Sequence, residues 1–251
     1  MTDKPDPMAA ARRPARPAPP RRFYKTAAVG THSNGFAVLL DGKVAKTPSR
    51  NPLAVTDRTI AEALAAEWEA QGERLDPASM PLTRIVNAAV DGVAGEMAAV
   101  RAEVVRYAGT DLICYRAEAP QPLVDAQSAA WDPLVAWARE ALGARLHLAT
   151  GIVHVKQDEA VLAAVDRALT PLDAFALAAV HTATTLTGSA IVALALFLGR
   201  LSVDEAWAAA HVDEDWQMRQ WGSDEAIFAT RARRKREMDA AGLMLRNASA
   251  H

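Results

Sequence analysis

The sequence predicts an α+β protein in which a small antiparallel sheet with packed helices is followed by a helical bundle. Between residues 22 and 55, Asn-Gly and Asp-Gly dipeptides separate short β-prone runs, a pattern typical of hairpins. Beyond about residue 93, nearly every segment has apolar residues at helical spacing, with glycine or proline between several of them. We therefore predict an α+β N-terminal domain over 22–92 and a helical C-terminal domain over 93–251.

The N-terminal residues 1–21 are predicted to be a disordered tail. The first twenty of them hold six prolines and almost no large apolar side chain, so they can neither bury surface nor propagate a helix. The most apolar run, residues 188–198, is too short to span a bilayer and predicts a buried core helix. We expect no membrane insertion.

The amino-acid composition is typical of a globular protein. Of 251 residues, 51% are hydrophobic and 23% are charged, and the net charge of −2 does not favour nucleic acid as a partner. The single cysteine, Cys114, cannot close an internal disulfide, which suits the reducing cytoplasm. No histidine lies near Cys114 in the sequence, so we predict a buried structural thiol rather than a nucleophile.

The elements follow from local patterns. Strands are expected around Phe36, Val38, Val44 and Val55, followed by a capped helix from Asp57 and a second helix over 81–91. Phe36, Trp68 and Trp131 are predicted to be core residues. The segment 145–157 alternates like a strand and predicts an extended connection or a short ribbon. Helices are expected at 94–107, 122–142, 158–169, 171–198, 202–220 and 223–240.

No motif of a common enzyme class is present. The sequence has no Walker phosphate loop, no Gly-x-Gly-x-x-Gly after a strand, no Gly-x-Ser-x-Gly and no His-Glu-x-x-His. We therefore expect no cofactor, no nucleotide site and no catalytic residue.

The stretch HVDEDWQMRQWG, residues 211–222, is the most unusual part of the chain. His211 and Asp215 share one helix face and could supply half of a zinc site, which leaves a metal-dependent or acid/base enzyme as one alternative. The favourable spacing of Asp215 and Arg219 predicts an ion pair that competes with metal binding. Asp213 and Glu214 are adjacent, so on a helix they point about 100° apart and do not converge on one substrate atom. We therefore expect no metal ligand here.

The same stretch is strongly acidic and aromatic. From Asp204 to Glu225 the sequence has seven acids and one base. The spacing of Val212 and Trp216 predicts that both turn into the core, which leaves either a solvated face or a partner-binding face outside. The basic run that follows, from Arg231 to Arg236, could touch RNA phosphates as an adaptor, but a solvated helix end is the favoured interpretation.

Seven blocks decide between these alternatives because they occur in one order. They are RFYK (22–25), GFAVLLDGKVAKTP (35–48), EWEAQ (67–71), MPLTRIVNAAVD (80–91), DLICYR (111–116), WDPLVAWA (131–138) and DEDWQMRQWG (213–222). Over roughly residues 22–230 the chain resembles the assembly chaperones of the F-type ATP synthase that handle the alpha subunit of its catalytic head.

The resemblance implies a function and a site. Such a chaperone binds the free alpha subunit until the beta subunit replaces it, and performs no chemistry. It works in the bacterial cytosol, or in the mitochondrial matrix for eukaryotic relatives, and we expect a monomer. The family has an important acidic position in the block that here reads VDEDWQ. The expected partner-binding residues are Asp213, Glu214, Asp215, Trp221 and Glu225.

Overall fold

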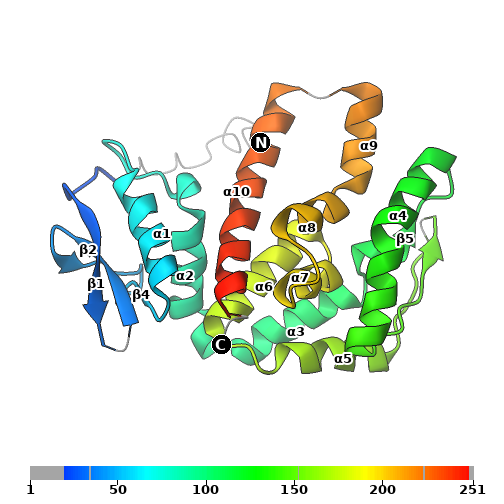
Figure 1. The fold of residues 1–251 in the computed structure, drawn as a ribbon, viewed down its shortest axis with the longest axis horizontal. Helices are drawn as coiled ribbons and strands as arrows, with labels where there is room; N and C mark the ends of the chain where they lie inside the picture. The colour runs from blue at the N-terminus through cyan, green and yellow to red at the C-terminus, as the bar shows by residue number, and fades with distance from the viewer. Residues whose placement is uncertain (1–19, 34, 152, 223, 249–251) are drawn as a thin grey trace, which may run out of the picture.

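A computed structural model describes residues 20–33, 35–151, 153–222 and 224–248. Figure 1 shows a small sheet at one end of an elongated molecule, with helices α1 (Arg58–Glu69) and α2 (Pro81–Asp91) between it and the remaining helices. The last helix, α10 (Glu225–Ala248), runs through the middle, and α4 (Gln121–Trp137) lies at the opposite end. This arrangement confirms the predicted α+β class.

The sheet consists of antiparallel hairpins, as predicted. Strand β2 (Gly35–Leu40) pairs with β1 (Ala27–His32), β3 (Lys43–Val44) and β4 (Ala54–Val55). The turn between β2 and β3 places Asp41 and Gly42 at φ of 48° and 79°, a left-handed conformation that aspartate and glycine tolerate best. α1 packs against this sheet, and its first turn is capped by Asp57, which accepts a hydrogen bond from the Ile60 N–H at 2.9 Å.

Two polar side chains at the end of α1 fix α2 in place. The Glu67 carboxylate accepts hydrogen bonds from the backbone N–H groups of Leu82 and Thr83, both at 2.8 Å, and so caps α2 from a neighbouring helix. Burial raises the pKa of Glu67, although these hydrogen bonds oppose the rise. Gln71 accepts from the Asp76 N–H at 2.7 Å and holds the connecting loop. Glu67 and Gln71 of the EWEAQ block therefore have structural roles.

Helix α2 joins the sheet end to the helical end. It packs against α1 on one side and against α6 (Ala174–Thr187) and α10 on the other. The buried apolar side chains of the described residues form one cluster that runs from Val38 in the sheet to Leu245 in α10. The division into domains at residues 92 and 93 stays a prediction, and we propose that α2 forms the interface between them.

Several predicted helices differ from those in the structure. The expected helix 171–198 is two helices because Gly188 takes a left-handed φ of 68° and Ser189 then caps α7 (Ala190–Phe197) by accepting from the Val192 N–H at 2.9 Å. The expected helix 202–220 is broken at His211, and 145–157 contains β6, which pairs in parallel with β5 as a short ribbon. The remaining bounds are α3 (Met97–Ala108), β5 (Tyr115–Arg116), β6 (Ala149–Thr150), α5 (Glu159–Leu169), α7 (Ala190–Phe197), α8 (Val203–Ala210) and α9 (Val212–Trp221).

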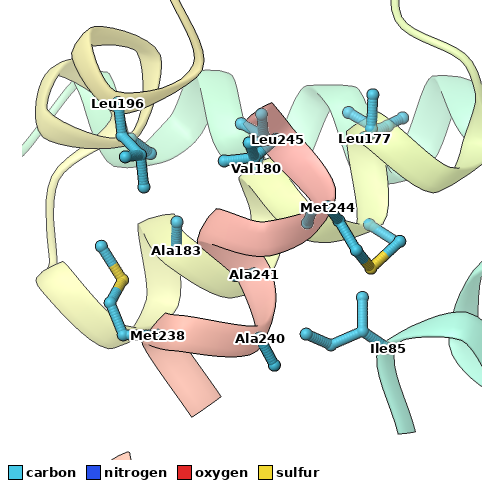
Figure 2. Close-up of a cluster of buried hydrophobic side chains, with 14 of the residues drawn as sticks. Ile85, Leu177, Val180, Ala183, Leu196, Met238, Ala240, Ala241, Met244 and Leu245 are labelled. Atoms are coloured by element: carbon cyan, nitrogen blue, oxygen red, sulfur yellow. The ribbon is translucent and has the colours of Figure 1, made fainter. Parts of the chain in front are cut away.

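The second half of α10 fills the centre of the molecule. Small and flexible residues line its buried face, which lets it approach its neighbours closely. Figure 2 shows this face against α6, α7 and α2, with the side chains of Ile85, Leu177, Val180, Ala183, Leu196, Met238, Ala241, Met244 and Leu245. The sequence pattern predicts a helix that ends at residue 240, whereas in the structure α10 continues to Ala248 because its last turns pack in the core.

The DLICYR block is structural. Asp111 is fully buried and accepts hydrogen bonds from the Ile113 N–H at 3.3 Å and the Ile191 N–H at 3.1 Å, so it caps α7 from outside. Burial raises the pKa of Asp111 to about 6. Cys114 is also fully buried, and burial together with the Asp111 charge raises the pKa of its thiol to about 12. The full burial of Cys114 confirms the predicted buried thiol, and a raised pKa does not favour a role as nucleophile.

Three further expectations concern the N-terminal tail, the aromatic residues and membrane insertion. Of the predicted tail, residues 1–19 lie outside the described residues, while the Pro20 carbonyl accepts from the Leu75 N–H at 2.9 Å. Trp131 is a core residue as predicted, whereas Phe36 and Trp68 are half-buried against the core. None of the described helices has the length and apolar character needed to cross a bilayer.

Candidate functional site

The stretch singled out in the sequence, residues 211–222, contains α9, which together with the first turns of α10 forms an arm. Both project from the helical body and are joined at their ends (Figure 1). The joint contains Gly222 at φ 74° and ψ −173°, a conformation essentially limited to glycine. Asp224 then caps α10 by accepting from the Ile227 N–H at 2.8 Å. No residue of α9 is fully buried, so the arm is held by contacts at its base.

His211 lies at that base, in the break between α8 and α9. Its side chain is buried, and its ring lies on the Trp207 ring with the two centroids 3.8 Å apart. Nδ1 donates to the Trp207 carbonyl at 2.8 Å, which assigns the proton to this nitrogen because a carbonyl only accepts. Burial lowers the pKa of His211, so the ring is neutral at neutral pH. His211 therefore supports the base of the arm.

The three acids of α9 have different surroundings. Asp213 accepts a hydrogen bond from Gln127 Nε2 on α4 at 2.7 Å. Glu214 lies 3.5 Å from Arg231 Nη1 and 3.9 Å from Arg234 Nη1, and it also approaches His211. Asp215 pairs with Arg231, so the predicted pair with Arg219 is wrong. Glu214 and Asp215 thus share one arginine, while Asp213 points toward α4.

The ion pairs with α10 reduce the acidic excess that the sequence suggests. Arg231 and Arg234 lie against α9, and Lys235 pairs with Asp204 of α8 at 2.8 Å. Arg234 also donates to the Leu186 carbonyl at 2.7 Å. These three bases belong to the run proposed as an RNA-binding segment, and the structure instead uses them inside the fold. Nothing in this geometry favours the RNA-adaptor alternative.

The geometry does not favour the metal-enzyme alternative either. His211 is buried and hydrogen-bonded at Nδ1, while Asp215 is engaged by Arg231, so the two do not face one open site. In the part of the chain that the structure describes, no three His, Cys, Asp or Glu side chains gather closely enough to hold a metal ion.

The predicted burial of Trp216 in the core is wrong. The sequence places it in the core with Val212, whereas in the structure only Val212 packs against the core and Trp216 is half-buried. α9 projects from the body, so a residue one turn further along reaches less of the interior.

We therefore expect Trp216→Ala to reduce the free energy of unfolding by about 1–2 kcal/mol, less than the ~3–5 kcal/mol typical of a buried tryptophan. Urea unfolding monitored by circular dichroism measures the change. A loss as large as that of a core tryptophan would contradict the half-buried placement.

The tip of the arm is apolar and exposed. Trp221 is 85% exposed, and Ile227 and Phe228 are exposed at 49% and 57%. Glu225 lies beside them at the start of α10. Ile227 lines a hollow of about 500 Å³ between α9 and α10, and Phe228 lines a second of about 330 Å³. Met218 borders both hollows.

The predicted site residues thus fall into two groups. Asp213, Glu214 and Asp215 lie at the base of the arm, and Trp221 and Glu225 lie at its tip. The sequence-based prediction missed Ile227 and Phe228, although an apolar pair shortly before a basic run was a visible signal. An exposed apolar group with acids around it is typical of a surface that another protein covers.

Comparison with known proteins identifies the family. Residues 21–139 match the family model described as ATP12 chaperone protein. The crystal structure of Atp12 from Paracoccus denitrificans is 40% identical, with a TM-score of 0.81 over 90% of this chain and 97% of that chain. This chain belongs to the ATP12 chaperone family.

Two further proteins are similar to this chain over most of its length. The structure of the Atu1473 protein from Agrobacterium tumefaciens is 44% identical, with a TM-score of 0.85 over 97% of this chain and 92% of that chain. Protein atp12, mitochondrial, of Schizosaccharomyces pombe is 27% identical over 221 residues, which are 82% of this chain and 75% of that protein. The family assignment gives this chain the general role of a chaperone in ATP synthase assembly.

Proposed function

We propose that this ATP12-family protein binds the free alpha subunit of the F-type ATP synthase head and shields the surface that the beta subunit later covers. It acts by binding, without chemistry, as a monomer in the cytosol. The observation that supports this proposal is the exposed arm, which presents Trp221, Ile227 and Phe228 to solvent next to acidic residues. An unassembled subunit exposes a large interface, and a chaperone with moderate affinity can cover it until the true partner displaces it.

The two ends of the arm have different roles in this proposal. The exposed aromatic tip is the anchor, because tryptophan contributes more than most residues to binding energy when an interface buries it. The acids at the base guide a basic surface of the partner and raise the rate of association. Because Arg231 already holds Glu214 and Asp215, the partner's cations meet a partly neutralised acidic face.

A pair of exposed aromatic residues tests the anchor. We expect Trp221→Ala to weaken binding of free alpha subunit about tenfold or more, the usual effect of removing an interface tryptophan. Phe23→Ala is the matched control, since Phe23 is 71% exposed and precedes β1 in the chain, outside the arm. Both variants should unfold within about 0.5 kcal/mol of the parent protein.

Biolayer interferometry with alpha and beta subunits presented separately measures this difference. If the parent protein retains no alpha subunit, the proposed partner is wrong. If it does retain alpha and both variants bind equally well, the anchor lies elsewhere.

The acids are tested with isosteric neutral residues, because lysine would also disturb their internal hydrogen bonds. We expect Asp213→Asn with Glu214→Gln to lower the association rate with alpha subunit at low salt and to have little effect at high salt. Glu62→Gln with Glu73→Gln removes two exposed charges near the sheet and is the control. Equal association rates for all three proteins at low salt would show that the charges of Asp213 and Glu214 do not guide the partner and act only within the fold.

A further inference from the structure

A third hollow lies where the sheet end meets the helical end and shares no lining residue with the two hollows of the arm. It has a volume of about 340 Å³, within the range of pockets that accept small ligands or single anchor side chains. Its walls come from the end of β4, the start of α1, the start of α6, the end of α7 and the C-terminal part of α10. We name it the α1–α6 pocket.

The walls of the α1–α6 pocket are mostly apolar. Val55 and Ile60 form the side next to the sheet, and Phe175 and Phe197 are the half-buried aromatic residues of the helical side. Met244, whose side chain Figure 2 shows between α10, α6 and α2, also lines it. Methionine is flexible and polarisable, so this wall can adapt to different side chains.

The polar part of the pocket is negatively charged. Asp57 and Asp173 cap α1 and α6, and each uses its Oδ1 atom to accept from a backbone N–H, at 2.9 Å and 2.8 Å. The lining residues include no lysine, arginine or histidine. The neighbouring Arg58 is paired with Glu62 at 2.8 Å. A cation brought to the pocket therefore meets two carboxylates without a competing basic residue in the lining.

We propose that the α1–α6 pocket binds an apolar side chain of a client polypeptide that has a lysine or arginine beside it. The apolar walls accept the side chain, and the two carboxylates select the neighbouring positive charge. The pocket is a second contact with the client, separate from the arm. The choice of the alpha subunit as that client rests on the proposed function, whereas the chemistry of the pocket does not.

The structure allows the charge to be removed without disturbing the fold. Asparagine caps helices about as well as aspartate, so Asp57→Asn with Asp173→Asn keeps both caps and removes both charges. Asp76→Asn is the matched control, because Asp76 caps a short helical turn elsewhere and does not line the pocket. The pocket is blocked from its exposed rim by Thr56→Trp, and Thr59→Trp on the exposed side of α1 is the control.

The first measurement uses a small probe and does not depend on the alpha subunit. The dipeptide N-acetyl-Trp-Arg-amide is titrated into protein labelled at its methionine methyl groups, with N-acetyl-Trp-Glu-amide as the comparison. We expect the Met244 signal to shift with the arginine probe and at least about fivefold weaker binding of the glutamate probe. The Asn pair should remove this preference, and Thr56→Trp should abolish the shift. An unmoved Met244 signal, or equal binding of the two probes, overturns the proposal.

The second measurement uses the free alpha subunit. We expect Thr56→Trp and the Asn pair each to weaken its binding about three- to tenfold, while Thr59→Trp and Asp76→Asn bind like the parent protein. If the parent protein binds alpha subunit and all variants bind it equally, the pocket proposal fails and the proposed function stands. If the parent protein binds no alpha subunit but the arginine probe saturates the pocket, the proposed function fails and the pocket stands.

Discussion

Truncation of Trp131 is expected to cause the largest loss of stability among single substitutions in the helical half. Its side chain is 1% exposed, and its indole Nε1 donates to the Ala209 carbonyl at 2.7 Å. Trp131→Ala removes this packing and leaves a buried carbonyl without a partner, so the free energy of unfolding should fall by about 4 kcal/mol. Ala209 precedes the break at His211, and the same change should therefore loosen the base of the arm and weaken client binding.

Trp131→Phe separates the two contributions. Phenylalanine keeps most of the ring packing and loses the hydrogen bond, so we expect a loss of about 1–2 kcal/mol. Urea unfolding of both variants measures the two losses of unfolding free energy. They can be compared if the unfolding free energy depends on urea concentration with the same slope in both variants. A Trp131→Ala variant within about 1 kcal/mol of the parent protein would be incompatible with a tryptophan that ties α4 to α8.

Asp111 is expected to make stability depend on pH. Its folded-state pKa of about 6 lies above the ordinary value of 3.8, chiefly because the carboxyl is buried. The folded protein therefore holds a proton between about pH 4 and pH 6 that the unfolded chain releases. The contribution of this group is fully present below the unfolded pKa and is lost as the pH rises through the folded pKa. The rise from 3.8 to about 6 corresponds to about 3 kcal/mol over the whole interval.

The measurement compares the parent protein with Asp111→Asn, which cannot titrate. The variant should be less stable at low pH because the asparagine side chain has one acceptor oxygen, and its amide nitrogen cannot accept the second of the two backbone hydrogen bonds. We expect the difference in unfolding free energy between the two proteins to narrow by about 2 kcal/mol from about pH 4.5 to pH 7.5. His211 titrates in both proteins, so its effect cancels. A difference that is constant over this interval would mean that Asp111 titrates normally.

The fold could be predicted to the extent that local rules decide it. Turn dipeptides located the hairpins, and helical spacing located most helices, because these signals depend on neighbouring residues. The breaks at Gly188 and His211 were missed for different reasons. At Gly188 a local signal was present, a glycine followed by the capping Ser189, but the apolar run that continues across it hid this signal. The break at His211 follows Ala209, whose carbonyl accepts from Trp131 of α4. Tertiary contacts of this kind leave no mark in a local pattern.

The candidate site could be located but not described from the sequence. Asp213, Glu214 and Asp215 stood out as an acidic run, and the excess of charge was counted within that run alone. The neutralising Arg231 is sixteen residues from Asp215 and comes back beside it only because α10 folds along α9. The inward orientation predicted for Trp216 failed because helical spacing gives the face of a helix but not how far that helix extends from the core.

The central place of α10 has a consequence for the synthesis of the protein. Domains generally fold as the chain emerges from the ribosome, with N-terminal parts first. Here α2 and α6 bury their apolar faces against Met238, Met244 and Leu245, which are translated after both helices. Until then, the nascent chain exposes these faces to solvent and is itself open to aggregation. A chaperone with this topology therefore has to complete its own translation before it can protect a client, and an mRNA truncated before α10 would yield a product that needs protection.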